Sequence, residues 1–505
     1  MALTKAAEAA EPMVRAPGLR SDALGLPTVL AQSVALISPT MTAVLIVPLA
    51  FADAGQGSWL AYLFGTVMLL FVVRCLNQFA RRSAAPGSMY SYTARGLGSA
   101  TGVFSGWTLM WCYLFIGTAG LTGFAIFAQQ FLDGIGVHAN VPPVLFFLTS
   151  AAMCWFVAYK DIRISSLLTL FIEALSMTCI LMLSAVVLFR HGFHVDTDQL
   201  ALKGMSFHGL SLGVVISIFS LVGFESATAL GGEAKKPLVN VPKAVRWSLI
   251  ISGSFFVILS YVEVSGTRHY TTSLANLSAP LNVLSQLYGV SFFKVPLSLC
   301  AMVSFFSLTL SCLNAGARII YPMAQHRVLP PALGRTHHIN RTPHMAVTVY
   351  MAIVVSVPVV LEVFTDPLTI FGDAGTLAAF GFLLAYFLIT VAAPVYLKKT
   401  GQLRRSDLVM AVAAFVLLLV PTEGSFYPVP AWPVDLFPYI FVAYVAVGAV
   451  WLYVAARRRP GILGEIAADL EAKEPQSATV IAPIEDPLTV AAVTRAPASG
   501  LEPAV

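Results

Sequence analysis

Long stretches of apolar residues dominate the chain, and short polar segments separate them. A helix needs about 20 mostly apolar residues to cross the hydrocarbon core of a bilayer, and repeated runs near that length are typical of a membrane protein. The pattern therefore predicts an all-α integral membrane protein with 12 transmembrane helices. The expected spans cover residues 26–52, 59–80, 101–131, 144–159, 164–189, 210–230, 245–264, 295–323, 345–363, 368–395, 407–420 and 434–455.

The composition agrees with lipid as the solvent of much of this chain. Hydrophobic residues make up 57% of it and charged residues only 11%, whereas a soluble domain carries about 25% charged residues. The six cysteines all fall inside apolar runs without metal-like spacing, so we expect them to be packing residues. Residues 1–25 lack the apolar core of a cleavable signal peptide, so the first span is expected to act as its own insertion signal.

Basic residues set the expected orientation in the membrane. With both termini in the cytoplasm, all but four of the 30 lysines and arginines fall on the cytoplasmic side. Because lysine and arginine are enriched in cytoplasmic loops, this bias predicts a multi-pass protein of the cytoplasmic (plasma) membrane with an even number of spans. The four residues on the outer side would be Arg190, Lys203, Arg268 and Lys294.

Helix-breaking residues interrupt two of the expected spans at mid-depth. The first span contains Ser38-Pro39-Thr40, and the sixth contains Val222-Gly223-Phe224-Glu225-Ser226. Proline removes a backbone donor and glycine weakens a helix interior, and freed backbone groups are tolerated in a membrane only beside protein or a wet cavity. Paired interruptions indicate the binding site of a transporter. The alternative is two simple kinks, relieved by serine or threonine side chains.

The spacing of the interruptions predicts an internal repeat. They lie five spans apart, which is an odd number, so the second unit would be inverted relative to the first. We expect a cytoplasmic tail, a first repeat, an inverted repeat, two added helices and a second cytoplasmic tail, disordered apart from an amphipathic helix near 462–473. These parts cover residues 1–25, 26–190, 209–395, 405–457 and 458–505, respectively.

The ends of the broken helices predict the kind of ligand. If Ser38 caps the second half of its span, the N–H groups of Thr40 and Met41 point into the site, and a helix N-terminus favours a carboxylate. The first half of span 6 ends near Leu221, where free carbonyls favour an ammonium group. We therefore expect a zwitterion between the breaks. The predicted binding residues are Ser38, Thr40, Met41, Leu221, Gly223, Phe224, Ser226 and Trp111.

Two carboxyl groups lie deep inside expected spans, Glu173 in span 5 and Glu225 at the break of span 6. Ionisable groups at that depth usually mark ion or proton paths, so both are candidates for proton coupling. Alternatively, Glu225 accepts N–H bonds that the break sets free, and Glu173 is a polar link between helices. Glu263 and Asp373 are placed nearer the outer surface and receive no role.

Other polar and aromatic side chains leave two interpretations open. Hydroxyl groups of span 8 can help to bind sodium against carbonyls of span 1, although bonding within their own helix is commoner. Aromatic rings of span 3 can form a wall of the site, or they can pack against lipid and neighbouring helices. The hydroxyl residues are Ser304, Ser307, Thr309 and Ser311, and the aromatic residues are Trp107, Trp111 and Tyr113.

Motifs of pumps and metalloenzymes are absent from the sequence. It contains no Walker-type glycine loop, HExxH or CxxC pair, so ATP-driven pumping, zinc chemistry and enzyme activity are not expected. No cofactor, metal or nucleic-acid partner is predicted. The expected partners are an amino acid or amine as substrate, a proton in preference to sodium, and the lipid bilayer.

Several segments of spans 3 to 8 resemble a known family when taken together. They are Gly223-Phe224-Glu225, Gly232-Glu233-Ala234-Lys235-Lys236-Pro237, Val241-Pro242-Lys243-Ala244, Asn314-Ala315-Gly316-Ala317-Arg318, Tyr321, Leu329-Pro330, Arg341-Thr342-Pro343, Pro86-Gly87-Ser88-Met89-Tyr90 and Gly106-Trp107. Their order resembles that of the amino acid–polyamine–organocation (APC) superfamily of permeases. The resemblance implies a LeuT-like core of five-plus-five inverted repeats, and proton-coupled import or exchange of amino acids or amines.

Two departures from that family bear on the substrate and on coupling. Many of its amino acid carriers have a glycine-rich stretch in span 1, where this chain has Ser38-Pro39-Thr40, and polyamine carriers are similar to it at this point. Some members place a lysine in span 5, where this chain has Glu173. The prediction is a secondary active amino acid transporter. A polyamine or other amine carrier and a membrane amino acid sensor that does not transport are the alternatives.

Overall fold

The described part of the chain is almost entirely helical. The computed structural model describes residues 19–472 except 86, 191, 193, 194, 278, 428, 430 and 431. Within these residues the helices are accompanied by one isolated parallel β-bridge, between Leu24 and Ala234. The first 18 residues, Pro86 of the family resemblance and the predicted disorder after 473 lie outside the described residues.

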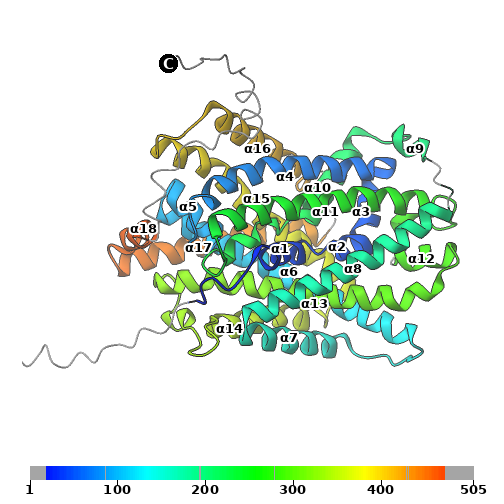
Figure 1. The fold of residues 1–505 in the computed structure, drawn as a ribbon, viewed down its shortest axis with the longest axis horizontal. Coiled ribbons are helices and arrows are strands. Elements are labelled where there is room, and N and C mark those ends of the chain that lie inside the picture. Colours follow the sequence, from blue (N-terminus) through cyan, green and yellow to red (C-terminus); the bar gives the residue numbers. More distant parts are fainter. Residues whose placement is uncertain are drawn as a thin grey trace, which may run out of the picture.

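Long helices run side by side across the molecule in Figure 1. Short helices lie at its two ends, with α9 (Thr197–Leu200) and α12 (Pro280–Leu287) at one end and α5 (Met89–Leu97) and α18 (Ile462–Ala472) at the other. The unbroken long helices are α4 (Ser58–Ala80), α6 (Ser99–Gly134), α7 (Pro143–Lys160), α8 (Ile162–Arg190), α11 (Pro237–Thr267), α13 (Lys294–Gln325), α14 (His344–Leu361), α15 (Pro367–Lys399), α16 (Arg405–Gly424) and α17 (Phe437–Arg458).

The helices confirm an all-α membrane protein. Among the described residues, 11 segments are long and apolar enough to cross a membrane. The first of them, Leu26–Ala80, has 55 residues, and one straight helix of that length would measure about 80 Å, against a hydrocarbon core of about 30 Å. A 3₁₀ turn, η2 (Gly55–Gly57), divides this segment, so we infer two passes there. The total of 12 spans stays a prediction.

Both predicted interruptions are present as breaks in helices. The first span consists of α1 (Leu26–Ile37), α2 (Pro39–Met41), the π-helix η1 (Thr42–Ile46) and α3 (Val47–Ala54). The sixth consists of α10 (Phe207–Leu221) and the 3₁₀ helix η3 (Phe224–Leu230). The remaining predicted spans agree with the observed helices to within a few residues, except that α11 begins eight residues earlier than expected.

Small residues let the central helices approach closely. A Cβ atom added to Gly120 of α6 would lie 2.3 Å from Thr309 of α13, and one added to Gly123 would lie 2.3 Å from the ring of Phe305. Small residues at such interfaces are typical of helix packing in membranes. By contrast α16 and α17 expose large apolar side chains such as Val409 and Val442, which suits contact with lipid. The six cysteines are buried and free, as expected of packing residues.

Candidate functional site

The first break is formed by a left-handed residue. Ser38 ends α1 with φ 49° and ψ 75°, and Pro39 takes the first position of α2, as the sequence predicts. Ser38 occupies the expected N-cap position of α2, but within the described residues its side chain makes no capping bond. Its hydroxyl lies 3.4 Å from that of Ser304 on α13. The neighbouring Thr40 and Met41 are buried. The break is therefore enclosed by protein.

A serine connects this break to Glu173. Ser304 donates a hydrogen bond of 2.8 Å to Oε1 of Glu173, which lies on α8 and is 2% exposed. Its Oε2 has no hydrogen-bond partner in the part of the chain that the structure describes. The contact brings a predicted coupling carboxyl next to Ser38. It also makes Ser304 a polar link between α8 and α13, so both interpretations of Glu173 stay open.

The second break is organised around Glu225. The chain leaves α10 at Leu221, and Gly223 follows with φ 100°. The N–H of Gly223 donates to Oε2 of Glu225 at 3.1 Å, and the hydroxyl of Tyr386 on α15 donates to the same oxygen at 2.8 Å. Tyr113 of α6 donates to Oε1 at 3.0 Å. Because both oxygens are satisfied, the geometry favours the interpretation that Glu225 fixes the break.

Hydrogen bonds join the two broken spans. Ser33 of α1 donates to the carbonyl of Phe224 at 2.7 Å and accepts from the N–H of Ala227 at 2.9 Å. Ser226 donates to the carbonyl of Gln32 at 3.2 Å. Ser33 and Gln32 were not predicted, because they lie in regular helix before the break and no local pattern marks them. Their contacts place the two predicted breaks side by side.

Several buried polar atoms on the helices around the first break have no hydrogen-bond partner among the described residues. Buried polar groups of native proteins nearly always have a hydrogen-bond partner, so a cluster of exceptions is typical of a ligand site. The helices that contribute them, α1, α2, η1, α8 and α13, pack against one another. The buried atoms without a partner among the described residues include, on these helices, Oε1 of Gln32, Oγ1 of Thr40, Oγ1 of Thr42, Oε2 of Glu173, Oγ of Ser307 and Oγ of Ser311, and further such atoms lie elsewhere in the fold.

The aromatic residues of α6 divide into two groups. Tyr113 reaches the site through Glu225, as described above. The indole N–H of Trp111 donates to the carbonyl of Leu377 on α15 at 2.7 Å, and its ring packs 4.5 Å from that of Tyr444 on α17. Trp107 stacks on the same tyrosine at 5.2 Å. These contacts hold α6, α15 and α17 together, and a substrate contact of Trp111 stays a prediction.

Hydroxyl groups of α13 also differ in their partners. Thr309 donates to the carbonyl of Phe305 at 3.1 Å, which is the commoner bond within its own helix. Ser304 instead turns toward Glu173. The described residues contain no group of three or more metal-ligating side chains.

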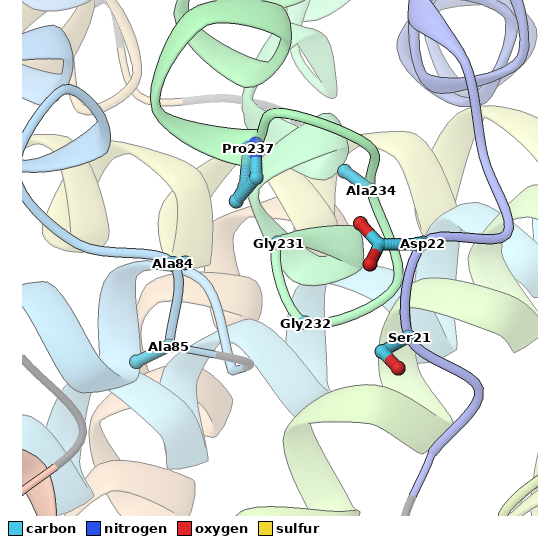
Figure 2. Close-up of a pocket in the computed structure, with 8 residues that line it drawn as sticks. All are labelled: Ser21, Asp22, Ala84, Ala85, Gly231, Gly232, Ala234 and Pro237. Atoms are coloured by element: carbon cyan, nitrogen blue, oxygen red, sulfur yellow. The ribbon is translucent and has the colours of Figure 1, made fainter. Parts of the chain in front are cut away.

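A cavity of about 350 Å³ lies at the end of the molecule where α1 begins. Figure 2 shows that its walls come from three segments: the chain before α1, the connection between α4 and α5, and the loop after η3. Beside it, the carbonyl of Glu233 accepts the N–H groups of Ala23 and Leu24 at 2.9 and 3.1 Å. The lining residues are Ser21, Asp22, Ala84, Ala85, Gly231, Gly232, Ala234 and Pro237.

A buried ion pair fastens this end of the fold. The guanidinium of Arg318 on α13 binds both carboxylate oxygens of Glu233, and each side chain is 1% exposed. Arg318 also donates to the carbonyl of Asn314 at 3.1 Å, and Asn314 donates to Ser165 of α8 at 2.6 Å. The pair therefore ties the loop after η3 to two long helices.

Glu233→Ala should destabilise the protein strongly, because it leaves the guanidinium of Arg318 buried without a counter-charge. Breaking such a pair costs about 3–5 kcal/mol. Asp161→Asn is the control, since it breaks the more exposed Arg20–Asp161 pair of 2.7 Å, where a loss below about 1 kcal/mol is expected. A thiol-reactive dye can follow thermal unfolding in detergent through the six buried cysteines. Equal unfolding temperatures for the two variants would contradict this prediction.

The fold is that of a multi-pass, all-helical membrane protein with two broken helices in contact at its centre. The chain matches the family model of amino acid permeases over residues 29–458. It belongs to the amino acid permease family, and this confirms the resemblance to the APC superfamily.

Individual relatives carry different transport names. The chain is 21% identical over 371 residues to the branched-chain amino acid permease BcaP of Bacillus subtilis, covering 70% of this chain and 76% of that protein. It is 22% identical over 433 residues to a D-serine/D-alanine/glycine transporter of Escherichia coli, covering 80% and 88%. It is 20% identical over 451 residues to a methylthioribose transporter of Bacillus subtilis, covering 86% and 92%.

Proposed function

We propose that the protein is a secondary active transporter that carries an amino acid across the cytoplasmic membrane by proton-coupled symport or exchange. The observation that carries the proposal is the cluster of buried, unpaired polar atoms around the first break, next to the second break. Relatives named as transporters of branched-chain amino acids and of D-serine, D-alanine and glycine support an amino acid substrate. The expected orientation has both termini in the cytoplasm.

The substrate would lie between the two breaks. The helical segment that starts at Pro39 continues through η1 and α3 to Ala54, so its first N–H groups, at Thr40 and Met41, offer partial positive charge to a carboxylate. The last carbonyls of α10, near Leu221, offer partial negative charge to an ammonium group. Ser38, Gly223, Phe224 and Ser226 would complete the site, with Trp111 as a predicted outer contact.

Glu173 is the proposed carrier of the coupled proton. One of its oxygens accepts from Ser304, which also faces Ser38, and the other is unpaired among the described residues. A carboxyl in this position can gain or lose a proton as the first break rearranges. Substrate and proton would then reach alternate sides by rocking of one helix bundle against the rest, inside a LeuT-like inverted repeat.

A carrier of polyamines or other amines is the second candidate. Ser38-Pro39-Thr40 stands where many amino acid carriers of the family have a glycine-rich stretch. In addition, one relative is named a methylthioribose transporter, so an amino acid is not the named substrate of every similar protein.

Competition for uptake separates these two candidates. In proteoliposomes, amino acids should compete with a labelled amino acid about 10–100-fold better than the amines formed by removing their carboxyl groups, because a hydrogen bond to a charged group contributes about 1.5–3 kcal/mol. Competition by diamines alone would favour the amine carrier. Binding without accumulation would favour a sensor and contradict transport.

A further inference from the structure

Glu263 is a buried carboxyl group without a partner. It lies on α11, its side chain is 0% exposed, and both of its oxygens lack a hydrogen bond to any of the residues that the structure describes. The sequence places it near the outer surface and assigns it no role, but the structure shows that neighbouring elements cover it completely. It differs from Glu225, which accepts three hydrogen bonds, and from Glu173, which accepts one.

The surroundings of Glu263 supply no compensating positive charge. Tyr62 of α4 is a titratable residue close enough to Glu263 to interact with it electrostatically. Its hydroxyl lies 3.5 Å from that of Ser220 on α10. The elements α1, α2, η1, η4 (Leu274–Asn276) and α12 contribute no titratable side chain. The other titratable groups on elements packed against α11 are Asp53 of α3, Arg74 and Cys75 of α4, Arg163, Glu173, Cys179 and Arg190 of α8, His208 of α10 and Glu225 of η3.

Neighbouring charged groups on the outer side are already engaged with one another. Arg268, at the end of α11, binds Asp196 and Asp198, and it donates to Gln56 at 3.1 Å. This network ties the end of α11 to the turn before α4 and to the region of α9. Glu263 lies four residues before Thr267, the last residue of α11. Separation of the elements at this end would therefore bring water to Glu263.

An ionised carboxylate is not stable in the buried, unpaired environment of Glu263. Burial of an unpaired charge in an apolar interior is so costly that the group takes up a proton instead. The packed arrangement of α11, α4 and α3 is accordingly compatible with the neutral acid and incompatible with the carboxylate. Packing of the outer end and protonation of Glu263 must occur together.

We infer that Glu263 is a proton-binding site loaded from the outer side, and that its protonation permits the outer half of the transporter to close over bound substrate. While the outer end is open, a carboxylate oxygen takes a proton from a hydronium ion, an O–H bond forms and a water molecule is released. When the end reopens, the O–H bond breaks and the proton returns to water. This inference rests on the proposed transport function, and it gives Glu263 a role separate from that of Glu173.

The test is exchange of labelled for unlabelled amino acid in proteoliposomes, with external pH varied at constant internal pH. In the wild type, exchange should fall about tenfold for each unit of external pH once the open-state carboxyl ionises, since closure needs one bound proton. Glu263→Gln keeps the shape and the neutral state, so its exchange should lose the part of this dependence that Glu263 causes, and the same measurement on Glu173→Gln gives the part that Glu173 causes. Glu263→Asp should keep the dependence, as should the control Glu423→Gln, which alters an exposed carboxyl at the end of α16.

The possible results distinguish failure of the inference about Glu263 from failure of the proposed transport function. A Glu263→Gln protein with the wild-type dependence on external pH would overturn the inference, and so would a wild type whose exchange ignores external pH, while transport itself would stand. Absence of any amino acid exchange in the wild type would instead overturn the proposed function. If Glu263→Gln fails to fold, Glu263→Asp decides, because it should shift the midpoint of the pH profile, and an unchanged midpoint would overturn the inference.

Discussion

Alanine at position 223 should lower transport by about 100-fold or more. Gly223 has φ 100°, and an added Cβ would lie 2.1 Å from Cδ2 of Leu36 and 3.2 Å from its carbonyl carbon. The left-handed backbone costs a residue with a side chain about 1–3 kcal/mol, and overpacking costs a further 1–3 kcal/mol or so. About 3 kcal/mol corresponds to a factor of roughly 100.

The position of Leu36 explains why the loss should fall on transport. It lies two residues before Ser38 in α1, so a methyl group at position 223 would push the two broken spans apart. Gly372→Ala in α15 is the control, because nothing lies within 4 Å of the place that its added Cβ would take. Initial uptake rates and dye-based unfolding should be measured on both variants. If Gly223→Ala takes up substrate at the wild-type rate, the second break tolerates a side chain at this position and transport does not require glycine there.

Glu173→Gln should abolish accumulation against a gradient. One unit of pH difference corresponds to about 1.4 kcal/mol and supports about tenfold accumulation for each proton carried. Glutamine can still accept the hydrogen bond from Ser304, but it cannot exchange a proton at neutral pH. The inside-to-outside ratio of substrate should therefore fall to about one, whereas exchange of labelled for unlabelled substrate should remain measurable.

The control for this prediction is Glu423→Gln, which should accumulate substrate like the wild type because its carboxyl is exposed. Substrate ratios are measured after an acid-outside pH jump and again without one. Normal accumulation by Glu173→Gln would remove Glu173 from the coupling mechanism and leave it as a polar link between α8 and α13.

The spans and both breaks could be predicted because a membrane constrains sequence directly. Lipid requires long apolar runs, and Pro39 and Gly223 interrupt such runs with residues that a regular helix disfavours. The family resemblance likewise depends on local motifs. These signals are contained in neighbouring residues, so one sequence is sufficient to find them.

Contacts between distant helices could not be predicted in the same way. Glu225 meets Tyr113 and Tyr386 because α6 and α15 present those faces to the second break, and no local pattern specifies how a helix is rotated about its axis. The burial of Glu263 has the same origin. Its distance from the end of α11 suggested exposure, but other elements cover that end.

The attachment of α18 has a practical consequence for measuring motion. Arg95 of α5 donates to the carbonyl of Leu470 at 2.6 Å, Ser99 of α6 donates to that of Leu463 at 2.7 Å, and His326 bonds to Asp469 at 2.8 Å. Because glycines let α6 and α13 pack closely, we expect α18, α6 and α13 to form one rigid unit. A spectroscopic probe on α18 would therefore be a fixed reference on that unit, and movement of α1 or α10 relative to it could be measured as a change in distance.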